Sequence, residues 1–145
     1  MAAETFVIDS TLLRDAAFAQ VVDLQRVGEW DRGIRTSRLV DGDAGSIGAR
    51  YEVTVTGFDG EPTTVIYELT SVDAPSTFTM VGTHPEFRAE DTVTFEPVSG
   101  GTRVTYDASL ILLGDDPPMS DAQLTDTFAK IVAVPRSGLT SFLNP

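Results

Sequence analysis

The sequence predicts an α+β protein in which a curved, seven-stranded antiparallel sheet wraps around a long C-terminal helix. Three observations predict it. A short β-branched stretch and a helical pattern stand near the N-terminus, strand-like segments separated by turn residues fill positions 34–112, and the apolar residues after Ser120 recur at helical spacing. A sheet with one apolar face must bury that face, and only the last helix is long enough to cover it.

The first elements are a strand and two short helical segments. Residues 4–9 (ETFVID) are apolar and β-branched, which is typical of a strand. Ser10 or Thr11 is expected to cap the helix that follows. Gly28 breaks the helical pattern, and residues 29–32 are predicted to form a turn or a one-turn helix. The apolar residues of the first helix recur at helical spacing and are Leu13, Ala17, Phe18, Val21 and Val22.

Six strands are predicted between the first helices and the last one. Their expected ranges are 34–40, 49–58, 63–72, 77–83, 87–97 and 102–113. Asp59-Gly60 and Gly100-Gly101 suit tight hairpins, because glycine accepts the positive φ that such turns require. Connections this short join neighbouring antiparallel strands.

The last predicted element is a helix from about Ser120 to Phe142. Ser120 and Gln123 have the spacing of a capping box. Pro135 lacks an N–H and crowds the preceding turn, so a kink is expected there. The apolar stripe of this helix consists of Leu124, Phe128, Ile131, Pro135, Leu139 and Phe142.

Composition limits the classes of function. The 145 residues form one predicted domain, and the net charge of -12 would repel nucleic acid and anionic membrane surfaces. Without cysteine and with one histidine, the chain offers no disulfide, thiolate catalyst or recognisable metal site, and no cofactor is expected. No secretory signal or spanning segment is visible, so a cytoplasmic protein without membrane insertion is expected. The sequence leaves open whether the protein forms a homodimer.

Alternation along the strands predicts which side chains face the helix. The inward set is apolar with a few polar tips, which is how small-molecule pockets orient a ligand. The buried tyrosines, however, could equally form hydrogen bonds to each other or to backbone carbonyls. The predicted ligand-binding residues are Trp30, Tyr51, Val53, Tyr67, Phe78, Met80, Phe87, Asp91, Val93 and Tyr106, with Phe128, Ile131 and Val132 from the last helix.

Asp91 is the least ordinary member of this set. A carboxylate that faces a cavity must be paired, hydrated or protonated, and desolvation raises its pKa. Arg35, Arg50 and Arg88 are candidate partners, although alternation points Arg50 and Arg88 outward. In the alternative interpretation, a bulge in the segment 87–91 leaves Asp91 on the surface.

Three residues are candidates for acid–base chemistry: His84, Asp91 and Tyr106. If they converge, His84 could act as a general base and assist enolisation of a bound poly-ketone. In the alternative interpretation, His84 is an exposed turn residue before Pro85. The sequence leaves both open.

Three motifs carry a resemblance to a known superfamily. They are EWDRGI at 29–34, GARYEVTV at 48–55 and DTVTFEPVSGGTRVTY at 91–106. Their order and spacing over nearly the whole chain resemble the START-like helix-grip superfamily (SRPBCC), most closely its bacterial polyketide cyclase/dehydrase-like proteins. The resemblance implies the helix-grip fold and a deep apolar cavity between the sheet and the C-terminal helix.

The resemblance leaves three functions open. The first is binding of a hydrophobic small molecule, such as a lipid or a polyketide. The second is a polyketide cyclase, aromatase or dehydratase that uses the same cavity. The third is a protein-interaction module like the chaperone-activator relatives. Trp30, the only tryptophan, is expected to anchor the turn after the first helix or to contact the ligand.

Overall fold

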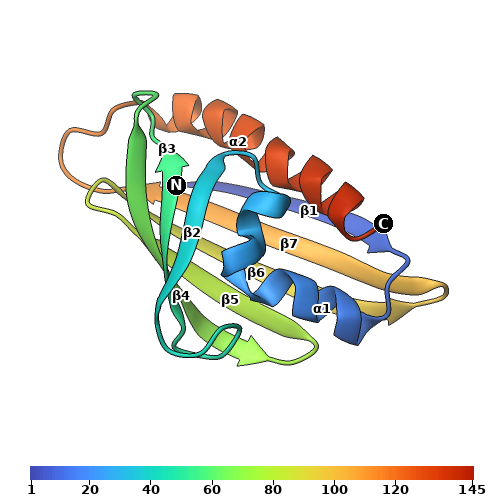
Figure 1. The fold of residues 1–145 in the computed structure, drawn as a ribbon. Helices are drawn as coiled ribbons and strands as arrows, with labels where there is room; N and C mark the ends of the chain where they lie inside the picture. Colours follow the sequence, from blue (N-terminus) through green and yellow to red (C-terminus); the bar gives the residue numbers. More distant parts are fainter.

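The computed structural model describes residues 1–145 and confirms the predicted α+β arrangement (Figure 1). A 3₁₀ helix, η1, is the second of the two short helices expected after the first strand. In chain order the elements are β1 (Ala2–Ser10), α1 (Arg14–Val22), η1 (Leu24–Glu29), β2 (Ile34–Asp41), β3 (Arg50–Thr56), β4 (Pro62–Asp73), β5 (Thr77–Thr83), β6 (Phe87–Val98), β7 (Gly101–Leu112) and α2 (Asp121–Phe142).

The seven strands form one antiparallel sheet in the order β1-β7-β6-β5-β4-β3-β2. Strands β2 to β7 follow one another as hairpins, whereas β1 pairs with β7 along its whole length, from Ala2 opposite Leu110 to Ser10 opposite Thr102. The helices lie over one face of the sheet, and α2 runs alongside β1 (Figure 1). No helix is both long and apolar enough to cross a membrane.

Strand alternation places the apolar side chains as the sequence predicts. In β7, Val104, Tyr106, Ala108 and Leu110 are all buried, whereas Arg103 is exposed. This alternation builds one continuous core between the sheet and the helices. The inner face of the sheet is therefore the face that the helices cover.

Local capping explains where α2 begins, but not where α1 begins. Ser120 Oγ accepts the N–H of Gln123 and the Gln123 side chain accepts the N–H of Ser120, so the predicted capping box of α2 is confirmed. The predicted cap of α1 by Ser10 or Thr11 is wrong, because α1 begins after Leu13 without a side-chain cap. The helix α2 continues through Pro135, which is buried.

Ser10 is instead part of a clasp between the first strand and the C-terminal residues. Its hydroxyl donates to the carbonyl of Leu143 at 2.5 Å. Asn144 accepts the N–H of Thr11 through Oδ1 and donates to the carbonyl of Asp9 through Nδ2. These bonds hold the end of α2 against the end of β1.

A second contact ties α2 to the turn after η1. Gly138 lies directly against the backbone of Trp30, and a Cβ at this position would overlap the Trp30 carbonyl group. Trp30 itself is 2% exposed and ends η1, with its N–H donating to the carbonyl of Val27. The absence of a side chain at position 138 therefore allows the helix to seat on the turn.

Candidate functional site

A cavity of about 40 Å³ lies between the inner face of the sheet and the segment 24–34. Eight of its ten lining residues are hydrophobic, and the exceptions are Asp31 and Asp91. The lining residues come from η1 and the turn after it, from the start of β2 and from strands β3 to β7, and they are Leu24, Val27, Trp30, Asp31, Ile34, Val53, Tyr67, Met80, Asp91 and Tyr106.

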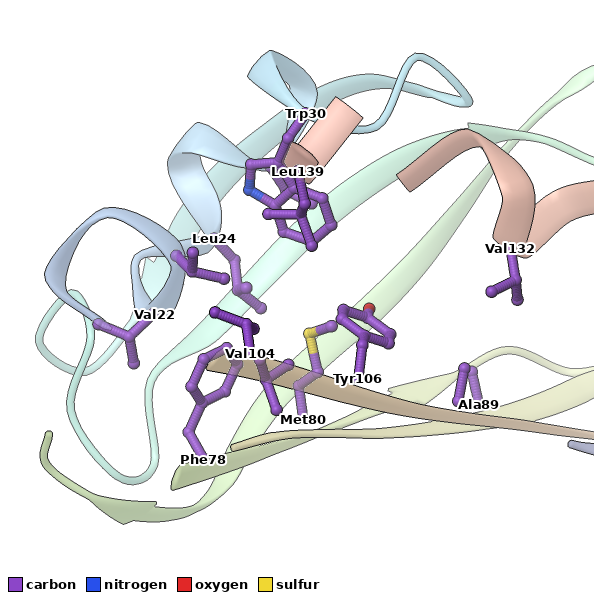
Figure 2. Packing of buried hydrophobic residues seen from close by; sticks show 14 of the residues in the cluster. Val22, Leu24, Trp30, Phe78, Met80, Ala89, Val104, Tyr106, Val132 and Leu139 are labelled. Atoms are coloured by element: carbon purple, nitrogen blue, oxygen red, sulfur yellow. The ribbon is translucent and has the colours of Figure 1, made fainter. Parts of the chain in front are cut away.

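Aromatic rings form much of this cavity wall. The indole of Trp30 meets the ring of Tyr106 edge-on, with centroids 6.3 Å apart, and Met80 lies beside Tyr106 on the sheet (Figure 2). Tyr67 lies opposite Gly82 on the neighbouring strand, where a Cβ would come within 2.7 Å of its ring. Gly82 thus leaves the space that the Tyr67 ring fills.

Asp91 and Tyr106 form the central polar contact of the site. The two residues lie on the paired strands β6 and β7, and the Tyr106 hydroxyl donates to Asp91 Oδ2 at 2.7 Å. Burial raises the pKa of Asp91 to about 7, the hydrogen bond from Tyr106 opposes this rise, and the charge of Asp31 adds to it. The protonation state of Asp91 therefore changes much closer to neutral pH than that of an exposed aspartate.

The pKa values of the other ionisable groups at the cavity are also shifted upward. Burial raises the pKa of Asp31, although its carboxylate accepts the N–H of Gly33 at 2.9 Å. Burial and then the nearby carboxylates raise the pKa of the Tyr67 and Tyr106 hydroxyls. No ion pair involves Asp31 or Asp91. The site is thus an apolar cavity with two uncompensated carboxyl groups.

Six of the predicted ligand-binding residues come together at this cavity: Trp30, Val53, Tyr67, Met80, Asp91 and Tyr106. The alternative in which a bulge turns Asp91 to the surface is wrong, because β6 pairs with both neighbours in unbroken register. None of the three arginines expected near Asp91 forms an ion pair with it. Arg50 pairs instead with Glu68, and Arg35 donates to Thr56.

The predicted wall formed by the C-terminal helix is wrong. No residue of α2 lines the cavity, because the turn around Trp30 lies between the sheet and the helix at this point. Phe128 and Val132 are buried in the core, whereas Ile131 is 45% exposed. The prediction that Ile131 faces the sheet is wrong, because Ile131 lies at the edge of the buried stripe of α2, beside Val132.

Four predicted ligand-binding residues of the sheet lie outside the cavity lining. Tyr51 is buried, and its hydroxyl accepts the N–H of Gly45 and donates to Asp23 Oδ1 at 3.3 Å. Phe78 packs on Phe18 of α1. Val93 is fully buried, and Phe87 stacks on His84 at the end of the sheet.

His84 does not join Asp91 and Tyr106. It lies after the end of β5, where Nε2 is 2.9 Å from the Thr63 hydroxyl and Nδ1 accepts the N–H of Glu86. Since Nδ1 is an acceptor, Nε2 carries the proton in the neutral ring and donates to Thr63. The predicted three-residue convergence is therefore wrong, and His84 stabilises the β5–β6 turn.

Four lining residues were absent from the sequence-based set: Leu24, Val27, Asp31 and Ile34. Leu24 and Val27 are three residues apart, which places both on one side of a 3₁₀ helix. Asp31 and Ile34 belong to the EWDRGI motif that also contains Trp30. The short η1 segment carries little periodic signal. Trp30 was the only residue of this region whose sequence setting indicated a role at the site.

Comparison with known proteins supports this fold and shows the family. The family model described as "Polyketide cyclase / dehydrase and lipid transport" matches residues 5–133. The fold and the family together thus define the class of this protein, the ligand-binding helix-grip proteins. The chain belongs to this polyketide cyclase/dehydrase and lipid transport family. No curated protein matches the sequence significantly.

Several solved structures share the fold at low sequence identity. A START superfamily protein from Mycobacterium smegmatis superposes with a TM-score of 0.78 and 11% identity, covering 98% of this chain and 95% of its own. The protein Ara h 8.0201 has a TM-score of 0.68 and 19% identity, with 98% of each chain covered. The di-domain ARO/CYC BexL from the BE-7585A biosynthetic pathway has a TM-score of 0.74 and 10% identity over 99% of this chain and 50% of its own.

Replacing Asp91 by asparagine is expected to stabilise the protein at high pH. The folded-state pKa of Asp91, about 7, lies above its unfolded value, so folding takes up a proton between about pH 4 and 7. The contribution of the protonated Asp91 carboxyl to the free energy of unfolding is fully present below pH 4. This contribution decreases as the pH rises toward 7. Urea unfolding should show that the advantage of Asp91→Asn grows from pH 5 to pH 8. An advantage that stays constant over this range would contradict the raised pKa.

Proposed function

We propose that this protein binds a hydrophobic small molecule, a lipid or a polyketide-like compound, in the cavity between the sheet and the segment 24–34. The observation that carries the proposal is the apolar cavity itself, into which the carboxyl group of Asp91 projects from the sheet. Few polar groups on an apolar wall are typical of sites that orient a small ligand. The family description, with its lipid transport, supports the same class of ligand.

Ligand binding requires the cavity to open. A water molecule needs about 10–15 Å³ of such space, so the 40 Å³ present here hold only a few waters. The segment 24–34 is the wall that has to move, because the opposite wall is the hydrogen-bonded sheet. The contact between Gly138 and Trp30 couples this movement to α2.

Trp30 provides a direct test of binding. Titration with Nile red, an uncharged hydrophobic dye, should quench Trp30 emission in a saturable manner, and native mass spectrometry should detect a one-to-one complex. Val53→Phe fills the cavity and should abolish both signals. Val7→Phe, on the outer face where Val7 is 50% exposed, is the matched control and should leave them unchanged. Binding that survives Val53→Phe would contradict the proposed site.

A second candidate function is a cyclase or dehydratase that acts in the same cavity. The observation in its favour is the pair of Asp91 and Tyr106, because a carboxyl group with a pKa of about 7 can both accept and donate a proton at neutral pH. Asp91→Asn should then abolish turnover of a poly-ketone substrate while its affinity persists. Full turnover by this variant would exclude Asp91 as the acid–base group.

Tyr106→Phe is expected to weaken ligand binding without disturbing the fold. The ring keeps its stacking on Phe6 at 4.9 Å, so only the hydroxyl is lost. A hydrogen bond contributes about 0.5–1.5 kcal/mol net, which corresponds to an affinity loss of about two- to tenfold. The pKa of Asp91 should rise further without its donor. Calorimetric titration and carboxyl NMR measure these effects, and an unchanged affinity with a large fall in melting temperature would show a purely structural role.

A further inference from the structure

The polar groups of the cavity differ from those of a site for a neutral lipid. Two carboxyl groups, Asp31 from the turn after η1 and Asp91 from β6, line one small cavity, and no arginine, lysine or histidine pairs with either. Their hydrogen-bond donors are all neutral: the Tyr106 hydroxyl and the backbone of Ser109 donate to Asp91, and the Gly33 N–H donates to Asp31. The positive charge that would neutralise them is absent from the protein around the site.

The aromatic side chains of the cavity add a second feature. Trp30, Tyr67 and Tyr106 line the same space as the two carboxyl groups. Aromatic faces attract cations when the cation lies within about 6 Å of the ring, and the attraction increases when water is excluded. Carboxylates together with aromatic rings therefore favour a ligand group with a positive charge.

Trp30 supplies an independent sign of a missing partner. The side chain is 2% exposed, and its indole N–H is buried without a hydrogen-bond acceptor. The nitrogen edge of the ring is turned toward Leu24, which also lines the cavity (Figure 2). A buried donor without a partner is costly, so a ligand oxygen that reached it would be stabilised.

We propose that the ligand is a lipophilic amine with an oxygen atom near its nitrogen, such as a long-chain amino alcohol. The ammonium group would lie between Asp31 and Asp91 against the aromatic rings, and the oxygen would accept the Trp30 N–H. The apolar tail would extend along the opened cavity. This inference rests on the proposed binding function and names the chemical class of the ligand.

The test compares ligands that share one alkyl chain. Octylamine, 2-amino-1-octanol, octanol and octanoic acid are titrated against the protein at pH 7.5 and low salt by calorimetry, with Trp30 emission as a second signal. Octylamine is expected to bind at least about tenfold more tightly than octanol, because charge-assisted hydrogen bonds are roughly twice as strong as neutral ones. The amino alcohol is expected to bind more tightly than octylamine, and octanoic acid most weakly.

Two variants connect this preference to the carboxyl groups. Asp91→Asn and Asp31→Asn are each expected to reduce the octylamine-to-octanol ratio by about fivefold or more, since each replaces a charge by an amide of similar shape. Asp107→Asn is the matched control. Asp107 lies on the exposed face of β7, where it accepts the Thr5 hydroxyl, so this variant should keep the wild-type ratio.

The outcomes separate the two proposals. A ratio of octylamine to octanol below tenfold, or an equal loss of this ratio in Asp107→Asn, overturns the amine preference but leaves the proposed function intact. An amino alcohol that binds no better than octylamine overturns the role of the Trp30 N–H. If neither octanol nor octylamine binds and Nile red also fails to bind, both proposals fall.

Discussion

Trp30→Ala is expected to lower the free energy of unfolding by about 3–5 kcal/mol, as for other buried large aromatic residues. Trp30 lies in the core, packs edge-on against Tyr106 and separates α2 from the sheet at the cavity. Its loss leaves a void that the rigid sheet cannot close. Total stabilities are about 5–15 kcal/mol, so the variant should lose about a fifth or more of its stability.

Urea unfolding followed by far-UV circular dichroism measures this change, since the variant has no tryptophan emission. Trp30→Phe is the matched control, because it keeps an aromatic ring in the same place and should lose clearly less stability. A loss below about 1 kcal/mol in Trp30→Ala would contradict the anchoring role. An emission maximum of the native protein at the position of solvated indole would contradict the burial of Trp30.

Gly138→Ala is expected to destabilise the protein by about 3 kcal/mol, although alanine is normally the better helix former by about 1 kcal/mol. The new Cβ would stand 2.6 Å from the carbonyl carbon of Trp30, closer than any real contact allows. Either α2 or the turn after η1 must then shift. Melting temperature and urea unfolding report the loss.

Ser137→Ala provides the control for this change. Ser137 is the exposed neighbour on the same helix, so its replacement should leave the protein unchanged or slightly more stable. If Gly138→Ala also stabilised the protein, the close seating of α2 on the Trp30 carbonyl would be wrong. A destabilised variant that binds Nile red more tightly would show that the contact holds the cavity closed.

Most of the fold was predictable because its signals are local and repeated. Alternation along β3 to β7 and the capping box at Ser120 each follow from neighbouring residues. The wrong cap of α1 has a different cause. The helix α1 begins only at Arg14, so Ser10 lies too far before it to cap it. Its hydroxyl instead accepts the N–H of Leu12 and donates to the carbonyl of Leu143, a partner far away in the sequence.

Apart from Trp30, the site was predictable only where it belongs to the sheet. Period-two alternation places Val53, Met80 and Tyr106 on the inner face, and the structure confirms that face. The opposite wall depends on how a six-residue 3₁₀ helix packs, and so short a helix has almost no periodicity. Ile131 was misplaced because an amphipathic stripe does not show where its edge lies.

The remaining predicted members of the site share one limitation. Alternation assigns a side chain to a face of the sheet, but it does not say where along the strand the neighbouring layer leaves a gap. Phe78 and Val93 point inward as predicted, yet both are fully buried in packed core. The position of the cavity was decided by Trp30 and Gly138, which are distant in sequence.

The pairing of β1 with β7 has a consequence for biosynthesis. The first strand finds its partner about a hundred residues later, and the hydroxyl of Ser10 finds Leu143 later still. Contacts of such long range slow folding, because the loop between them must be ordered first. During synthesis on the ribosome, β1 therefore cannot pair with β7 until most of the domain has been translated.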